Sequence, residues 1–266
     1  MDFSIEEQVA IVTGGSQGIG RAIAETLAEE GCYVAIGARN DPETVADEIA
    51  PEPGRVIGVT GDITSQDDVE SLVAETIGAF GGVDVLVNNV GILGSEKPFH
   101  EIPDDEWWSV IDVNVMGTVR ATREVLPHMR EEGSGVIVNV ASEAGTQPDA
   151  FKTHYDATKA AMINMTKNLS KTYGREGIRV NAVSPATTKT PLVEEIFEQR
   201  AAETGQSLEQ VEREFIAEEK PGVVTGRLGK PQDIGNVVAF LVSERAEFVH
   251  GANWRIDGGS IWTMDV

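Results

Sequence analysis

The chain has 266 residues, of which 41% are hydrophobic, enough to bury the sizeable core of one α/β domain. It carries 44 acidic and 21 basic residues, a formal net charge of −23, so we expect no binding to nucleic acid or to an anionic membrane. The one cysteine, Cys32, excludes an intramolecular disulfide, and the chain shows neither an apolar signal segment nor a membrane-length apolar run, which together predict a cytoplasmic location.

The excess of acidic residues also predicts adaptation to a high-salt cytoplasm. Like charges on a compact chain repel one another, and dissolved salt screens that repulsion. Such a chain should therefore lose stability at low ionic strength. An unusually acidic protein from an ordinary cytoplasm remains the alternative.

Strand and helix patterns alternate along the chain. Short apolar runs predict strands at Val9–Val12, Tyr33–Ile36, Val56–Val59, Val83–Val87, Gly135–Val140 and Ile178–Val183, and a late one near Asn253–Ile256. Between them we expect helices over Arg21–Glu30, Val69–Phe80, Asp104 to about Arg130, and Tyr155–Tyr173. Continuous apolar strands that alternate with helices indicate a doubly wound parallel sheet with helices on both faces.

A glycine-rich turn, Thr13–Gly20, joins the first strand to the first helix. Glycines let a backbone approach a pyrophosphate, whose charge the helix N-terminus then stabilises. The spacing differs from the usual dinucleotide fingerprint, and a tight connection alone would look similar. The strand before it, the helix after it and a second strand about 20 residues on favour a dinucleotide site. The contacts expected from this turn are Gly14, Ser16, Gln17, Gly18, Ile19 and Gly20.

The end of the second strand bears on the choice of dinucleotide. An acid here often binds the ribose 2′-hydroxyl of NAD, whereas this chain has Arg39 and Asn40. A guanidinium suits a 2′-phosphate and can bind it bidentately, so we expect NADP(H) to be preferred over NAD(H). An Arg39 that faces solvent, or that pairs with Asp41, would weaken this prediction.

Tyr155 and Lys159 lie one helical turn apart and therefore share a helix face. A free phenol has a pKa of about 10, and a neighbouring cation lowers it toward the working pH. The pair is thus a candidate general acid/base. Alone, the same spacing also fits an exposed helix face.

The segment Pro191–Lys220 is rich in Glu and Gln and interrupts the alternation. Ser207 and Gln210 have the form of a capping box, so two helices are expected here, inserted after the sixth strand. We interpret residues 187–228 as a lid over a substrate cleft, because ligands bind at the carboxyl ends of such strands. A solvated helix pair on the outside is the alternative.

Several further motifs occur in a fixed order. They are Asn88-Asn89-Val90-Gly91, Asn114 in Asp112-Val113-Asn114-Val115, Ser142 thirteen residues before Tyr155, Pro185-Ala186 and Asp257-Gly258-Gly259. With the glycine turn and the Tyr155/Lys159 pair, they make nearly the whole chain resemble the compact, single-domain short-chain dehydrogenase/reductases. That family has a Rossmann-type fold, which the resemblance extends over residues 1–266. Val90 and Ala186 depart from its usual Ala and Gly.

The resemblance implies hydride transfer between a nicotinamide and a carbonyl or carbinol carbon. It makes Asn114, Ser142, Tyr155 and Lys159 the catalytic residues. Tyr155 would move the proton, Lys159 would lower the Tyr155 pKa and bind the ribose, Ser142 would hold the substrate oxygen, and Asn114 would anchor a water.

The resemblance also supplies further contacts. For the cofactor these are Asp62, Ile63, Asn89, Tyr155, Lys159, Pro185, Thr188 and Thr190. For the substrate, loops of the family suggest Leu93, Glu143, Phe151 and Leu192. The helix Tyr155–Tyr173 and the long helix before it form subunit interfaces in the family, so a homotetramer is expected. The four scattered histidines have no metal-ligand spacing, and we predict no metal site.

The leading hypothesis is an NADP(H)-dependent alcohol dehydrogenase or ketoreductase for a small-molecule substrate. A 3-oxoacyl thioester reductase and a sugar, steroid or other secondary-alcohol dehydrogenase stay open within it. The lack of a basic patch weighs against an acidic acyl carrier. A non-catalytic NADP(H)-binding sensor is the alternative from another class, and the complete set of four catalytic residues weighs against it.

Overall fold

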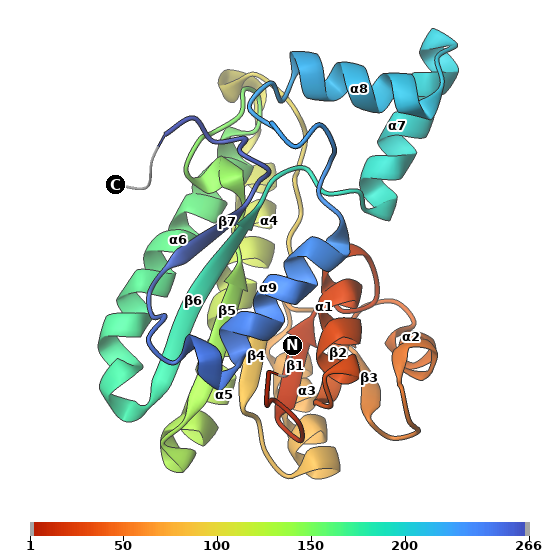
Figure 1. Cartoon of the computed structure of the whole chain (residues 1–266). Helices are drawn as coiled ribbons and strands as arrows, with labels where there is room; N and C mark the ends of the chain where they lie inside the picture. The colour runs from red at the N-terminus through yellow and green to blue at the C-terminus, as the bar shows by residue number, and fades with distance from the viewer. Residues whose placement is uncertain (1–2, 264–266) are drawn as a thin grey trace.

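The computed structural model describes residues 3–263, which form one seven-stranded parallel sheet in the order β3-β2-β1-β4-β5-β6-β7 (Figure 1). The strands are β1 (Val9–Thr13), β2 (Tyr33–Ala38), β3 (Val56–Thr60), β4 (Val85–Asn88), β5 (Gly135–Val140), β6 (Ile178–Pro185) and β7 (Asn253–Ile256). The helices are α1 (Gly18–Glu29), α2 (Pro42–Ile49), α3 (Gln66–Phe80), α4 (Asp104–Ile111), α5 (Gly117–Glu132), α6 (Thr153–Tyr173), α7 (Pro191–Thr204), α8 (Leu208–Glu218) and α9 (Pro231–Val242). The predicted doubly wound sheet is confirmed.

The sheet changes winding direction at β1, which pairs with β2 on one side and with β4 on the other. Chain segments after the carboxyl ends of these two strands diverge and leave a crevice, where ligands of open α/β sheets bind. The glycine turn follows β1, and Asn89 follows β4. The topology therefore brings these two motifs to one place.

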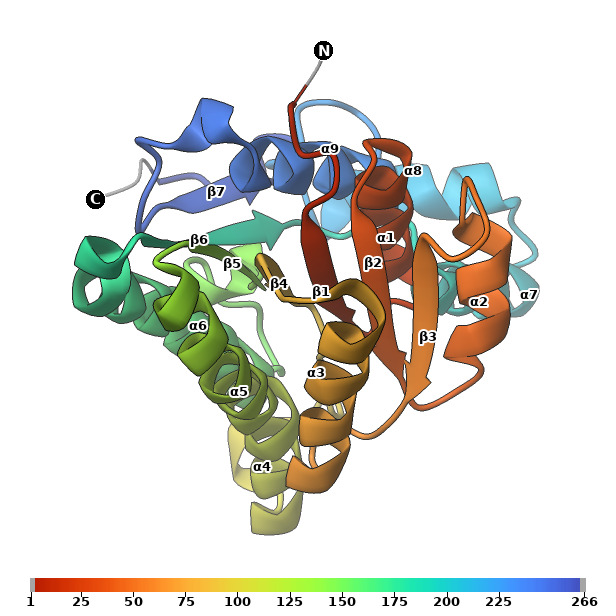
Figure 2. The same ribbon diagram turned by 90° about the horizontal axis from the view of Figure 1, so that it is seen from below.

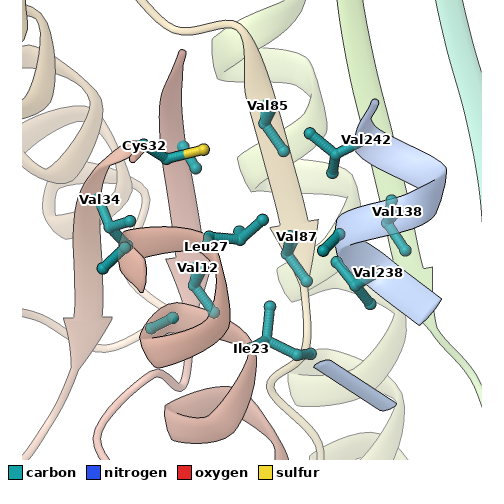
Figure 3. Packing of buried hydrophobic residues seen from close by; sticks show 14 of the residues in the cluster. Val12, Ile23, Leu27, Cys32, Val34, Val85, Val87, Val138, Val238 and Val242 are labelled. Carbon is teal, nitrogen blue, oxygen red and sulfur yellow. The ribbon is translucent and has the colours of Figure 1, made fainter. Parts of the chain in front are cut away.

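Helices cover both faces of the sheet. Seen from below, α1 and α9 lie on one side, and α3, α5 and α6 lie on the other (Figure 2). Successive residues of β1 point to opposite faces, because side chains alternate along a strand. Val12 belongs to one buried cluster with Ile23 and Val238 (Figure 3), whereas Ile11 belongs to a second cluster. Val12, Ile23 and Val238 are fully buried.

The helix predicted from Asp104 to about Arg130 is divided in the structure. It comprises α4, a π-helical turn at Asp112–Met116 and α5. Asn114, at the centre of this wide turn, bonds to Ile92 and Thr158 of other segments. The difference matters because single π-helical turns occur frequently at functional sites.

Helices α7 and α8 lie together at one end of the molecule, away from the sheet (Figure 1). They share a small core of Phe197, Val211 and Leu228. The predicted capping box is present, since Ser207 Oγ accepts from Gln210 N and Gln210 Oε1 accepts from Ser207 N. Within residues 3–263, no helix combines the length and hydropathy needed to cross a membrane.

Candidate active site

Tyr155 and Lys159 extend from the first two turns of α6, next to the end of β5. The Lys159 side chain is buried, and its Nζ donates to Val140 O at 2.9 Å and lies 5.6 Å from the centre of the Tyr155 ring. Ser142 begins the loop after β5, where its Oγ accepts from Ala144 N at 3.2 Å and its hydroxyl also bonds to Tyr155. The structure thus brings three of the four predicted catalytic side chains together.

The Tyr155 phenol differs from the sequence-based expectation that Lys159 lowers its pKa. Burial raises the pKa of Tyr155 to about 12; a hydrogen bond from Ser142 opposes the rise, and the charges of Asp156, Asp149 and Glu143 add to it. The expectation was wrong because burial of the phenol dominates its pKa, while Lys159 Nζ donates to Val140 O. At neutral pH this phenol is protonated and suited to donate a proton.

Lys159 is itself perturbed. Burial lowers the pKa of its ammonium to about 8, since an ion in a low-dielectric interior loses hydration. The group therefore stays mainly charged at neutral pH and gives up its proton more readily than an exposed lysine would.

Asn114 fixes the loop that follows β4. Its Oδ1 accepts from Ile92 N at 2.8 Å, and its Nδ2 donates to Ile92 O and to Thr158 Oγ1, both at 3.0 Å. Gly91 in this loop approaches so closely that an added Cβ would lie 3.3 Å from Lys159 Nζ. The fully buried Asn114 therefore ties the π-helical turn, the post-β4 loop and α6 into one unit.

A cavity of about 690 Å³ lies at the crevice beside β1 and β4. Twelve of the residues predicted to bind the cofactor line it: Gly14, Ser16, Gln17, Gly18, Ile19, Gly20, Arg39, Asn40, Asp62, Ile63, Asn89 and Thr190. Other lining residues, which include Ser109, Val113 and Thr64, were not anticipated. Ser109 and Thr64 lie outside any motif, and Val113 belongs to a motif from which only Asn114 was assigned a role. Pro185, Thr188, Asn114, Ser142, Tyr155 and Lys159 are not among the lining residues of this cavity.

The glycine turn fits a dinucleotide pyrophosphate. Gly14 has φ of +68°, and an added Cβ at Gly20 would lie 2.2 Å from Gly14 O, so the turn accepts no side chain at these places. Asn89 Nδ2 donates to Thr13 O at 3.0 Å and Gly14 O at 3.2 Å, which holds the turn against β4. A bare backbone at the N-terminus of α1 is the arrangement that binds phosphate.

Arg39 stands at the rim of the cavity. Its side chain is 70% exposed, the solvent-facing arrangement that weakens the NADP(H) prediction, and its Nη1 lies 3.9 Å from Asp62 Oδ2. The pairing with Asp41 that would have weakened the cofactor prediction is not observed in the described part of the chain, where Asp41 Oδ1 accepts from Thr44 Oγ1 instead. Bonds from Thr64 hold the pKa of Asp62 below its usual range, so Asp62 is ionised there.

The predicted substrate residues do not share one environment. Leu192 lines the cavity and is exposed, and Phe151 is exposed with φ of +67°. Glu143 is buried and paired with Lys220, a residue that sequence analysis missed. Lys220 follows the run Glu218-Glu219, an isolated cation within an acidic segment, which is the one signal that could have marked it.

His154 is fully buried beside Tyr155, with its Nε2 3.1 Å from Glu106 Oε1. Glu106 also accepts from Ser95 N, so it joins α4, the post-β4 loop and α6. Bonds to Ser95, aided by His154 and Lys97, lower the pKa of Glu106 to about 2. This network therefore connects α6 with α4 and with the loop after β4.

Comparisons with known proteins agree with this geometry. A family model described as short chain dehydrogenase matches residues 8–201. The cis-4-hydroxycyclohexanecarboxylate dehydrogenase of Sinomonas cyclohexanicum is 37% identical over 260 residues, 97% of this chain and 98% of the relative. Among solved structures, L-sorbose reductase from Gluconobacter frateurii, complexed with NADPH and L-sorbose, has a TM-score of 0.93 at 33% identity, covering 99% of this chain and 100% of that one. A 3-ketoacyl-(acyl-carrier-protein) reductase from Brucella melitensis, complexed with NADH, has a TM-score of 0.85 at 33% identity, covering 97% of this chain and 100% of that one.

The chain belongs to the short-chain dehydrogenase family. It is an oxidoreductase that transfers hydride between a nicotinamide cofactor and a secondary alcohol or its ketone. The resemblance inferred from the sequence motifs is confirmed.

Proposed function

We propose that this enzyme is an NADPH-preferring ketoreductase for neutral, polar ketones, in which Ser142, Tyr155 and Lys159 act on the substrate and Asn114 positions them. The observation that carries the proposal is the convergence of these side chains where β5 and α6 meet, beside the dinucleotide cavity. A non-catalytic sensor would have no use for this convergence.

The roles follow from the atoms. Bound NADPH would supply the hydride, held by the glycine turn, Asn89 and Thr190. Tyr155 Oη donates a proton to the carbonyl oxygen as that oxygen gains charge, and Ser142 Oγ donates a hydrogen bond to the same oxygen. Lys159 keeps a positive charge beside the resulting phenolate. In the reverse direction the ionised phenol would accept the proton of the alcohol.

The preference for NADPH rests on Arg39. It is the exposed cation at the rim of the cavity, positioned at the end of β2, where the ribose 2′ group lies in such folds. L-sorbose reductase was solved with NADPH, whereas the Brucella reductase was solved with NADH, so family membership alone leaves the choice open.

Replacing Arg39 tests this preference. In Arg39→Ala we expect KM for NADPH to rise about tenfold or more, since a charge-assisted bond to phosphate is lost, while KM for NADH changes little. Steady-state kinetics with both cofactors would measure the two values. An equal change for NADPH and NADH would contradict the role of Arg39 as phosphate ligand.

The preference for a neutral substrate rests on the charges near Tyr155. Glu143, Asp149 and Asp156 raise its pKa, and Lys220, the cation nearest the first two, is already paired with both. An anionic substrate would meet carboxylates and no free cation from this cluster. L-sorbose, bound by the structurally similar reductase, is a neutral ketose.

A substrate panel tests this class. NADPH oxidation would be followed with neutral ketoses, neutral cyclic ketones, a 3-oxoacyl thioester and a steroid ketone, in molar KCl. We expect kcat/KM to be highest for a neutral polar ketone. Faster reduction of the anionic 3-oxoacyl-coenzyme A would overturn the charge argument and favour the thioester reductase.

The lid and the subunit arrangement complete the proposal. Thr190 and Leu192, at the start of α7, line the cavity, which supports residues 187–228 as a substrate lid. An apolar groove of about 490 Å³ between α5 and α6 is lined by Leu126, Met165 and Leu169, which supports a second copy of the chain docking there in a homotetramer. Light scattering of the purified enzyme in KCl would give a mass near that of four chains.

A further inference from the structure

One partly buried lysine joins the lid to the loop between Ser142 and Tyr155. Lys220, just after α8, places its Nζ 2.8 Å from Glu143 Oε1 and 2.8 Å from both carboxylate oxygens of Asp149. Its side chain is 12% exposed, and that of Glu143 is 6% exposed. Glu143 directly follows Ser142, and Asp149 lies six residues before Tyr155. A single ammonium therefore binds to both halves of the loop that carries the catalytic hydroxyls.

Other ion pairs of α7 and α8 in the described chain stay within the lid. Arg200 pairs with Glu219, and Lys189 pairs with Glu212. These pairs fold the lid onto itself but do not fix it to the sheet. Lys220 is different because its partners belong to the loop after β5.

The carboxylates around Lys220 depend on it. Glu143 Oε2 is buried without a hydrogen-bond partner, so Lys220 is the cation that compensates this carboxylate. Removing one member of a buried pair leaves an uncompensated charge, which is strongly unfavourable. Another cation nearby, Lys152, is paired with Glu96.

We propose that Lys220 is a positioning residue for the reaction: it holds the lid on the substrate end of the site and neutralises Glu143 and Asp149 beside Ser142 and Tyr155. This inference rests on the function proposed above for the two hydroxyl groups. In this proposal one lid side chain both closes the substrate pocket and opposes the negative charges that act on the Tyr155 phenol.

The electrostatic part follows from the groups that face Tyr155. From α6 these are Lys159 and Asp156, and from the loop after β5 they are Glu143 and Asp149. Burial works against the charge of Lys220, but its bonds to Asp149 and Glu143 outweigh that effect and raise its pKa, so it is cationic throughout the working range. Without it, both carboxylates would act unopposed on the phenol and raise the Tyr155 pKa further.

The primary experiment compares Lys220→Met with Arg200→Met, which removes one positive charge from the same lid but breaks only a pair internal to it. Hydrogen exchange of residues 191–218 is measured without substrate. In Lys220→Met we expect clearly faster exchange there, and KM for the ketone raised about tenfold with KM for NADPH unchanged. In Arg200→Met the change in lid exchange should be much smaller, because its pair with Glu219 is exposed, and both KM values should match wild type.

The pH profile separates charge from closure. In the alcohol-oxidation direction turnover rises as the phenol ionises, and in Lys220→Met that rise should move to higher pH. The triple variant Lys220→Met/Glu143→Gln/Asp149→Asn removes the cation together with both anions. It should return the rise to the wild-type pH or below, while exchange of the lid stays fast. Lys220→Arg should restore both properties in large part.

Wild-type exchange of the lid in Lys220→Met, or an unchanged pH profile together with an unchanged KM, would overturn the proposal. If Lys220→Met does not fold, the triple variant, which carries no uncompensated charge, gives the exchange result. Hydrogen exchange needs no turnover, so a failure of the proposed ketoreductase activity would be seen separately, as absence of turnover in wild type.

Discussion

The side chains next to Tyr155 show how charge is managed in this site. Asp156 is 4% exposed, and burial, reinforced by Asp149, raises its pKa to about 6. When the pKa of a carboxyl is higher in the folded than in the unfolded chain, its ionisation lowers the free energy of unfolding. The ionised Asp156 therefore destabilises the protein at neutral pH. The same charge raises the pKa of the adjacent Tyr155.

This argument predicts the effect of Asp156→Asn. The folded chain binds the Asp156 proton more tightly than the unfolded chain between about pH 4 and 6, so stability falls as pH rises through that window. Removing the charge should raise the free energy of unfolding by about 2–3 kcal/mol at pH 7.5, and by little near pH 4. Urea unfolding at both pH values measures this, with the exposed Asp47→Asn as control. Equal gains at the two pH values would refute the assignment.

Some of these residues could be predicted from sequence and others could not. Tyr155, Lys159, Ser142 and Asn114 lie in local motifs whose spacing is set by one strand end or one helix face. The pKa of Tyr155 was predicted in the wrong direction, because burial of the phenol and the charges of Asp156, Asp149 and Glu143 raise it. Lys220 was missed, because its partners are 71 and 77 residues distant in the chain.

Among loops and helices, the segment after β4 depends on one glycine. Gly94 has φ of +70°, and an added Cβ would lie 2.2 Å from Nε2 of the buried His154. His154 cannot move aside easily, since Glu106 holds it. The loop after β4 is therefore held at two places: Asn114 accepts from Ile92 N, and Glu106 accepts from Ser95 N.

We expect Gly94→Ala to lower the free energy of unfolding by about 2–4 kcal/mol, from left-handed backbone strain together with overpacking. Gly133→Ala is the matched control, because Gly133 has φ of +66° but no atom within 4 Å of the added Cβ, so it should lose only about 1–2 kcal/mol. Urea unfolding curves give both values. Equal losses would show that contact with His154 is unimportant.

Strands and helices were predicted correctly from the sequence where the hydrophobic periodicity was strong. The seven predicted strands and the capped lid helix are present. The helix from Asp104 was predicted as continuous, but a π-helical turn divides it, and the bonds of Asn114 to distant segments mark that turn. Helices α2 and α9 carry no motif and were not predicted.

Over the whole molecule, the net charge of −23 is the dominant property that family membership does not explain. Salt adaptation stays a prediction. We expect the melting temperature to rise by several degrees or more between low and molar KCl, because screening reduces repulsion among exposed carboxylates. Calorimetry across a KCl series, with sucrose as a non-ionic control, measures it. A melting temperature independent of KCl would refute salt adaptation.

The proton donor can be tested by comparing wild type with Tyr155→Phe for NADPH oxidation with the best ketone of the panel, alongside NADPH binding by fluorescence. Tyr155→Phe should lose turnover by about a thousandfold or more, while the dissociation constant of NADPH stays within about threefold, because the dinucleotide cavity is lined by other residues. Turnover at the wild-type rate in Tyr155→Phe would contradict the account of this site.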